Sequence, residues 1–147
     1  MRGGTFKMPL SKISSKSVKL HIPSQNNEVI KEFLKNVREY DFAYPSKLLM
    51  VWWKYFQYDT MPIDELAENI LHDDNFKHLT SWDYKNTTVF VETYVPVQLP
   101  IRTQMKELAT KMDTPYQRVV LYCWNQIAND IKSGLFTYQK YIECSKE

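Results

Sequence analysis

Residues 95–109 read VPVQLPIRTQMKELA and residues 114–127 read TPYQRVVLYCWNQI, and these two stretches decide the expected fold. Apolar residues alternate with Pro96 and Gln98, which is the period of a strand with one buried face, and Pro100 ends that strand where a helix can begin. The strand residues expected to face inward are Val95, Val97 and Leu99. Apolar residues then recur every three or four positions, as on one face of a helix: Met105, Leu108, Ala109 and Met112.

A second helix is predicted after residue 114. Thr114 supplies a hydroxyl that can cap a helix, and Pro115 suits the first helical position. The apolar residues of this helix are Val119, Val120, Cys123, Trp124, Ile127 and Ile131. The order of elements is therefore strand, helix, turn, helix.

The same order is predicted earlier in the chain. Apolar residues alternate over 18–22, Pro23 ends that strand, and Ser24 is a candidate cap for a helix over 29–37. A turn at 41–45 leads to a second helix over 46–56. This helix aligns with 117–127 and matches Lys47 with Arg118, Leu48 and Leu49 with Val119 and Val120, and Trp53 with Trp124. The chain is therefore expected to contain two copies of one architecture with diverged sequence.

A short strand that ends in a proline after an aliphatic residue, followed by two helices, resembles the ribbon-helix-helix family, to which the Arc and Met repressors belong. The resemblance covers about 17–56 and 95–131. It implies a mainly α (α+β) fold in which tandem units form an intramolecular pseudo-dimer with a two-stranded antiparallel ribbon. The expected divisions are a flexible basic arm (1–16), a first unit (17–58), an acidic helical connector (59–93), a second unit (94–132) and a C-terminal extension (133–147), all within one compact domain.

In that architecture the ribbon enters the major groove of DNA with its polar face toward the base edges. Alternation turns Lys19 and His21 outward in the first strand and Gln98 in the second. Lysine donates to guanine, histidine donates or accepts, and glutamine can pair bidentately with adenine. Pro96 departs from the family pattern because it lacks an N–H, which puts the pairing of the second strand in doubt. An ordinary solvated strand face is the alternative interpretation.

The N-termini of the second helices are the expected phosphate contacts, since their free N–H groups and positive dipole attract anions. The candidate residues are Ser46 and Lys47 in the first copy and Thr114, Gln117 and Arg118 in the second. Helix capping explains Ser46 and Thr114 equally well. The matched cations Lys47 and Arg118 favour phosphate contact.

Charge is distributed unevenly along the 147 residues, although the net charge is only +2. Residues 1–58 hold 10 Lys and Arg against 4 Asp and Glu, residues 59–93 hold 2 against 8, and residues 94–147 hold 7 against 5. A basic N-terminal unit beside an acidic middle suits binding of a polyanion with one face. Solvation of an ordinary surface is the competing explanation.

The segments outside the repeat give fewer signals. A helix is predicted from about residue 62 to 71, with acids in its first turn. Residues 87–94 either extend the second ribbon strand or form a hairpin at Lys85 and Asn86. A helix over 44–56 with such a hairpin would make a winged-helix arrangement. After Ser133 and Gly134, apolar residues indicate a short closing element.

Signatures of catalysis and metal binding are absent from the sequence. Its 3 glycines leave no phosphate-cradling loop, and there is no nucleophile elbow, HExxH or paired CxxC motif. The only His and Asp cluster is His72, Asp73, Asp74 and His78, whose spacing fits no strong metal signature and indicates a solvated acidic loop. We therefore expect no enzyme activity, cofactor or metal.

Cysteine content and hydropathy bear on localisation. Cys123 and Cys144 have no spacing typical of a disulfide framework, which suits a reducing cytoplasm. No apolar run approaches the length of a membrane span, and residues 1–16 lack the apolar core of a signal peptide.

These observations predict a sequence-specific protein that binds double-stranded DNA. By resemblance, tandem members of the family act as accessory proteins at plasmid transfer origins, in the relaxosomes of conjugation, or as transcriptional repressors. A relaxase or another DNA-processing enzyme is the implied partner, together with self-association on adjacent sites. The alternatives are a winged-helix DNA reader and a protein-interaction module or enzyme inhibitor that uses the acidic middle and aromatic surface.

Overall fold

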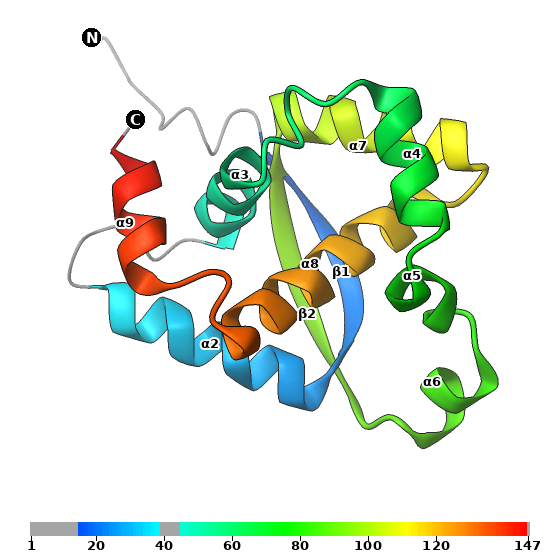
Figure 1. Cartoon of the computed structure of the whole chain (residues 1–147). Helices are drawn as coiled ribbons and strands as arrows, with labels where there is room; N and C mark the ends of the chain where they lie inside the picture. Colours follow the sequence, from blue (N-terminus) through cyan, green and yellow to red (C-terminus); the bar gives the residue numbers. More distant parts are fainter. Residues whose placement is uncertain (1–14, 39–44, 147) are drawn as a thin grey trace, which may run out of the picture.

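The computed structural model describes residues 15–38 and 45–146, and in that part of the chain it contains eight helices and two strands (Figure 1). The elements in chain order are β1 (Ser15–Pro23), α2 (Ser24–Val37), α3 (Pro45–Tyr55), α4 (Ile63–Leu71), α5 (Asp74–His78), α6 (Trp82–Thr87), β2 (Phe90–Gln98), α7 (Leu99–Met112), α8 (Tyr116–Ser133) and α9 (Tyr138–Ser145). The mainly helical α+β class is confirmed. The basic arm expected at 1–16 lies outside the described residues except for its last two, which belong to β1, and so does most of the turn expected at 41–45.

The two predicted strands pair with each other. β1 and β2 are antiparallel, from Ser15 opposite Gln98 to Pro23 opposite Phe90. Four residues of the inner face are buried almost completely: Leu20, Ile22, Val95 and Val97. Pro96 lies opposite Ser17 without interrupting the pairing, because each strand of a two-stranded ribbon has a free edge that needs no N–H donor. The ribbon is therefore continuous over nine residues of each strand.

The ends of the predicted helices need three corrections. Leu99 was expected on the inner strand face, but it begins α7 and is 48% exposed. Ser24 does not cap a later helix, because β1 passes directly into α2 and the Ser24 N–H donates to the Val89 carbonyl. Thr114 does not cap α8 either, since that helix has no side-chain cap at its N-terminus. Gly134, in the left-handed conformation at φ 83°, ends α8 as predicted.

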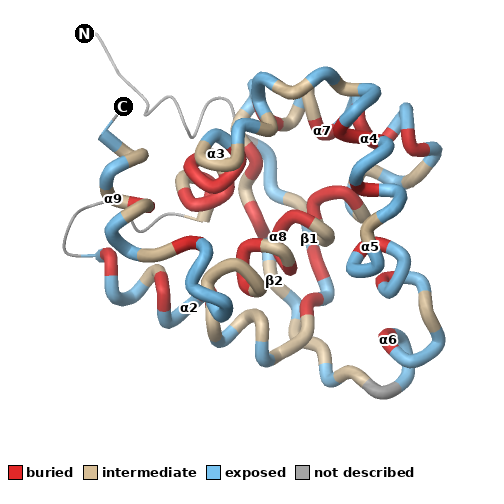
Figure 2. The backbone as a smooth tube through the Cα atoms, viewed as in Figure 1, coloured by how far each residue is buried: buried red, intermediate tan, exposed pale blue. Residues whose placement is uncertain are grey.

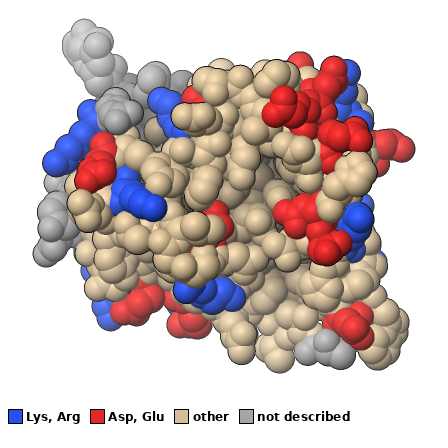
Figure 3. All heavy atoms as spheres, in the orientation of Figure 1, with Lys and Arg blue, Asp and Glu red and all other residues tan. Residues whose placement is uncertain are grey.

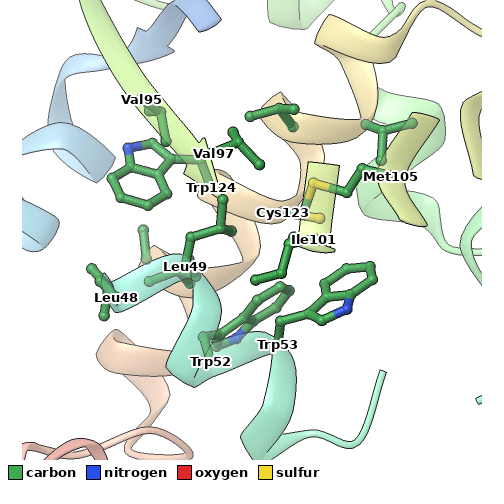
Figure 4. Packing of buried hydrophobic residues seen from close by; sticks show 14 of the residues in the cluster. Leu48, Leu49, Trp52, Trp53, Val95, Val97, Ile101, Met105, Cys123 and Trp124 are labelled. Carbon is green, nitrogen blue, oxygen red and sulfur yellow. The ribbon is translucent and has the colours of Figure 1, made fainter. Parts of the chain in front are cut away.

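The core lies under the ribbon, where α3 contacts β2 and α8 contacts β1. Figure 2 shows buried residues along both helices and both strands. Helix α3 contributes Leu48, Leu49, Trp52 and Trp53, and α8 contributes Val119, Val120, Cys123, Trp124 and Ile127. Figure 4 shows the four α3 residues packed near Cys123 and Trp124. The apolar pairs matched by the sequence repeat are thus buried in one cluster.

Two indole N–H groups connect the two halves of this core. Trp52 Nε1 donates to Asp130 Oδ2 on α8 at 2.8 Å, and Trp53 Nε1 donates to Gln104 Oε1 on α7 at 2.8 Å. A buried indole needs such an acceptor, because an unpaired N–H inside a protein is costly. These bonds fix the position of α3 relative to the second half of the chain.

Three helices, α4, α5 and α6, lie within 59–93, and the last residues of this segment, 90–93, begin β2. α4 matches the predicted helix and packs on α7, where Lys111 Nζ lies 2.7 Å from Asp64 Oδ1. Of the two alternatives for 87–94, extension of the ribbon strand is observed from Phe90 onward, whereas the hairpin at Lys85 and Asn86 is wrong because both residues belong to α6. Within the described ranges the only strands are β1 and β2, so the winged-helix arrangement, which requires that hairpin, is not formed.

The predicted closing element is helix α9, which packs against α2 and α3. Phe136 and Tyr141 are buried, and their rings lie 5.8 and 5.7 Å from the ring of Phe33 in α2, centroid to centroid. The C-terminal segment therefore belongs to the same hydrophobic core as the ribbon, α3 and α8.

Candidate nucleic-acid interface

The outer face of the ribbon carries the polar side chains of both strands. Antiparallel pairing brings Lys19 opposite Tyr94 and His21 opposite Glu92, and all four residues are exposed. Ser17 is also exposed, whereas Pro96 and Gln98 are half-buried. The alternation of β1 and β2 therefore leaves Lys19, His21 and Gln98 on the face predicted for them.

Glu92 is the residue of this face that the sequence analysis missed. Its Oε2 lies 3.0 Å from Lys19 Nζ and 3.5 Å from His21 Nε2. The hydrogen bond from Lys19 lowers the pKa of the Glu92 carboxyl, and the same bond raises the pKa of the Lys19 ammonium. Glu92 alternates in phase with Tyr94 and Gln98, so continuing the predicted strand towards its N-terminus would have identified it.

The charges on the outer face of the ribbon are confined to one half, although Lys16, in the other half of β1, is also exposed. Val18 pairs with Val95, next to the central pair of the ribbon, which is Lys19 and Tyr94. On one side of this pair, the outer face carries Lys19, His21 and Glu92 together with Tyr94; on the other side it carries only uncharged residues, among them Ser17, Pro96 and Gln98. The two halves thus present different chemistry to any surface that the ribbon contacts.

The N-terminus of α8 lies against the charged half of the ribbon. Gln117 Nε2 donates to the backbone carbonyl of Lys19, and Arg118 Nη1 donates to Thr114 Oγ1 at 3.1 Å. A groove beside β1 is lined by His21, Gln117, Arg118, Leu20, Leu79, Pro115 and Leu121. Five of the eight predicted site residues are therefore gathered at this edge, where Thr114 orients the guanidinium rather than capping the helix.

The N-terminus of α3 offers fewer of the predicted phosphate contacts than the N-terminus of α8. Lys47 is half-buried, and α3 packs on β2, the opposite strand from the one that α8 contacts. Ser46 is only 8% exposed. Burial keeps its hydroxyl from a bulky phosphate, so we remove Ser46 from the candidate interface.

Acidic side chains gather over α4 and α5 on the helical side of the molecule, which Figure 3 shows. The acids of their first turns are Asp64, Glu65 and Asp74. Because α8 passes in front of the ribbon in this orientation, the outer ribbon face points away from the viewer (Figure 1). The acidic surface over α4 and α5 and the outer face of the ribbon thus point in different directions.

The cluster at residues 72–78 has structural partners. Asp73 Oδ1 caps α5 by accepting from the Asn75 N–H at 2.9 Å, and its Oδ2 accepts from the Tyr122 hydroxyl at 2.5 Å. Across residues 15–38 and 45–146, no group of His, Cys, Asp and Glu is arranged to hold a metal ion. No helix in the described part of the chain is long and apolar enough to span a bilayer.

Comparison of the chain with protein-family models, with curated proteins and with solved structures found no match. The geometry of the ribbon and of the adjoining helix N-termini is therefore the basis for assigning a function.

Proposed function

We propose that this chain is a tandem ribbon-helix-helix protein that binds double-stranded DNA with its ribbon in the major groove. The observation that carries the proposal is the pairing of the two strands about Val18 and Val95, which occupy equivalent positions because each lies five residues before the proline that ends its predicted strand, Pro23 or Pro100. A two-fold relation between the copies produces this register, because the equivalents of two paired residues then also pair: Lys19 faces Tyr94, and their equivalents Pro96 and Ser17 face each other. The major groove admits a two-stranded ribbon of this kind.

Contacts to bases and contacts to phosphates have separate sources in this proposal. Lys19, His21 and Gln98 extend from the outer ribbon face toward base edges. Arg118 and Lys47, at the N-termini of α8 and α3, contact the backbone on the two sides of the groove. Gln117 links β1 to α8 through its bond to the Lys19 carbonyl, which holds the N-terminus of α8 next to the base-reading strand.

The unequal halves of the ribbon favour an asymmetric target. A homodimer reads the same sequence twice, whereas a fused chain presents Lys19, His21 and Glu92 to one half-site and Gln98 to the other. Such a reader suits an accessory role at a plasmid or other mobile element, where it marks or bends a site for a relaxase or another DNA-processing enzyme. Transcriptional repression at an asymmetric operator is the closest alternative.

Selection of bound duplexes from a random pool, at two salt concentrations, tests the proposal. We expect one enriched motif without two-fold symmetry, with affinity falling as salt rises. Lys19→Ala combined with His21→Ala should lower discrimination between sites more than nonspecific affinity. Lys54→Ala is the matched control, since it removes an exposed lysine at the end of α3 and should leave the motif unchanged. Failure to enrich any duplex at low salt would reject DNA binding.

A protein-interaction module is the second candidate. Trp82 in α6 is 70% exposed and Val89 is 73% exposed, and both belong to the acidic connector. Exposed aromatic residues are enriched in protein interfaces. If no duplex is selected, substituting Trp82 would be the first test of a protein partner.

A further inference from the structure

Glu92 is an unexpected residue on a DNA-binding face, because its carboxylate repels the phosphates around the groove and lowers affinity for every sequence. Its position is nevertheless well defined, with Oε2 between Lys19 Nζ at 3.0 Å and His21 Nε2 at 3.5 Å. A residue that reduces general affinity while being held between two donors fits a role in discrimination between sequences.

Resting on the proposed DNA binding, we infer that Lys19 and Glu92 act together to read one G·C base pair, with Lys19 donating to guanine and Glu92 accepting from cytosine. The ammonium and the carboxylate lie side by side at 3.0 Å. In a G·C pair the guanine O6 acceptor and the cytosine N4 donor are hydrogen-bonded to each other, so they lie about 2.9 Å apart. The spacing of the two side-chain groups thus matches the spacing of the two base atoms that they complement.

The order of groups across the major groove explains why G·C is preferred over the other pairs. Lys19 over guanine meets two acceptors, N7 and O6, while Glu92 meets the N4 donor of cytosine. A T·A pair in the same orientation offers Lys19 only O4 beside a methyl group, and it places the adenine N7 acceptor near the Glu92 carboxylate. In the reversed pairs the ammonium meets a donor, N4 in C·G and N6 in A·T, and the carboxylate meets an acceptor, O6 or O4; A·T also offers the ammonium adenine N7. We therefore rank G·C first, T·A second and both reversed pairs last.

The charged half of the ribbon keeps this arrangement in place. Glu92 lies directly opposite His21 and diagonally opposite Lys19, so donors on two positions of β1 flank the carboxylate. Gln117 binds the carbonyl of Lys19 and holds the backbone from which the ammonium extends. Lys19 alone would donate to any major-groove acceptor, because an ammonium is a non-directional donor. The carboxylate restricts it to acceptors that lie next to a donor.

The test uses the full chain and the duplex that it selects, with each position changed to all four base pairs. The wild-type chain should show one position at which G·C is preferred over the reversed pair by roughly tenfold or more. Glu92→Gln should move the preference at that position from G·C to T·A, because a carboxamide pairs with adenine N6 and N7. It should also raise affinity for random duplexes, since a negative charge has been removed from the interface.

Glu143→Gln in α9 is the control, because it removes an exposed carboxylate that is not on the ribbon and should leave the motif and its preference unchanged. Both variants replace exposed carboxylates and should fold normally, which circular dichroism verifies. If the wild-type chain selects a motif and Glu92→Gln shows the same base preference at every position, the inference is overturned while DNA binding stands. Failure of the wild-type chain to select any duplex would overturn the proposed function itself.

Discussion

The bond between Trp52 and Asp130 is the clearest test of whether the two halves of the chain share one core. Trp52 in α3 is 1% exposed, and its Nε1 lies 2.8 Å from Asp130 Oδ2 in α8. Its ring packs against Tyr58 and Phe56, with centroid distances of 5.3 and 5.9 Å. Trp52→Phe keeps an aromatic ring in this position while removing the N–H donor and part of the ring volume.

The expected loss of stability has two parts. A hydrogen bond to a charged group contributes about 1.5–3 kcal/mol, and the lower end applies because Asp130 is only half-buried. The space left by the smaller ring adds roughly 1–2 kcal/mol, as other core truncations of this size do. We therefore expect Trp52→Phe to lower the free energy of unfolding by about 3 kcal/mol, a large share of the total for a domain of this size.

Chemical denaturation followed by tryptophan fluorescence and circular dichroism measures this loss. Trp53→Phe is the matched control, because Trp53 is also 1% exposed but donates to the neutral Gln104 oxygen at 2.8 Å. Its loss should be smaller by about 1 kcal/mol. In a cycle with Asp130→Ala, Trp52→Phe should cost about 1.5 kcal/mol less than in the wild-type chain, because the hydrogen bond is already absent. Equal costs in both backgrounds would refute a direct bond between α3 and α8.

Three further measurements test other parts of the structure. Lys47→Ala and Arg118→Ala should each weaken binding to every duplex and reduce the slope of log affinity against log salt by about 1, and an unchanged slope would remove that residue from the phosphate contacts. Burial raises the pKa of the Asp130 carboxyl above its unfolded value, so Asp130 favours the folded state below about pH 4 and loses this contribution as pH rises through the folded pKa. Asp130→Asn should therefore flatten the dependence of melting temperature on pH above about 4, and a parallel dependence in both proteins would contradict the shift. Burial also raises the pKa of the Cys123 thiol, so thiol reagents should modify Cys123 only after unfolding, and rapid modification of the native protein at both cysteines would show that α8 is accessible.

Local patterns were sufficient to predict most elements of this fold. Alternation over 18–22 and 95–97 identified both strands, because inward and outward positions must differ in polarity on a ribbon with one buried face. The three- and four-residue spacing of apolar residues identified the helices that follow each strand. The prediction for Leu99 was wrong because Pro100 favours a helical start, which moves the preceding residue out of the strand.

The ion pairs of the candidate interface required the register of the two strands. Lys19 and Glu92 are 73 residues apart in sequence, and only the antiparallel pairing that begins with Ser15 opposite Gln98 brings them together. A shift of that register by two residues would preserve the buried face and exchange every partner on the outer face. The chemistry of the ribbon was therefore not predictable from either strand alone.

The sequence by itself determined the composition of the two ribbon faces, the order of the repeated elements and the uneven distribution of charge. The faces follow from alternation between residues close in sequence, and the order and the charges are read directly along the chain. Tertiary structure decided which polar groups meet: Glu92 with Lys19, Gln117 with the ribbon backbone, and Asp130 with Trp52. It also buried Ser46, which local pattern had placed at the surface. The physical reason is that hydrogen bonds and ion pairs act over a few ångströms, so they depend on how distant segments pack.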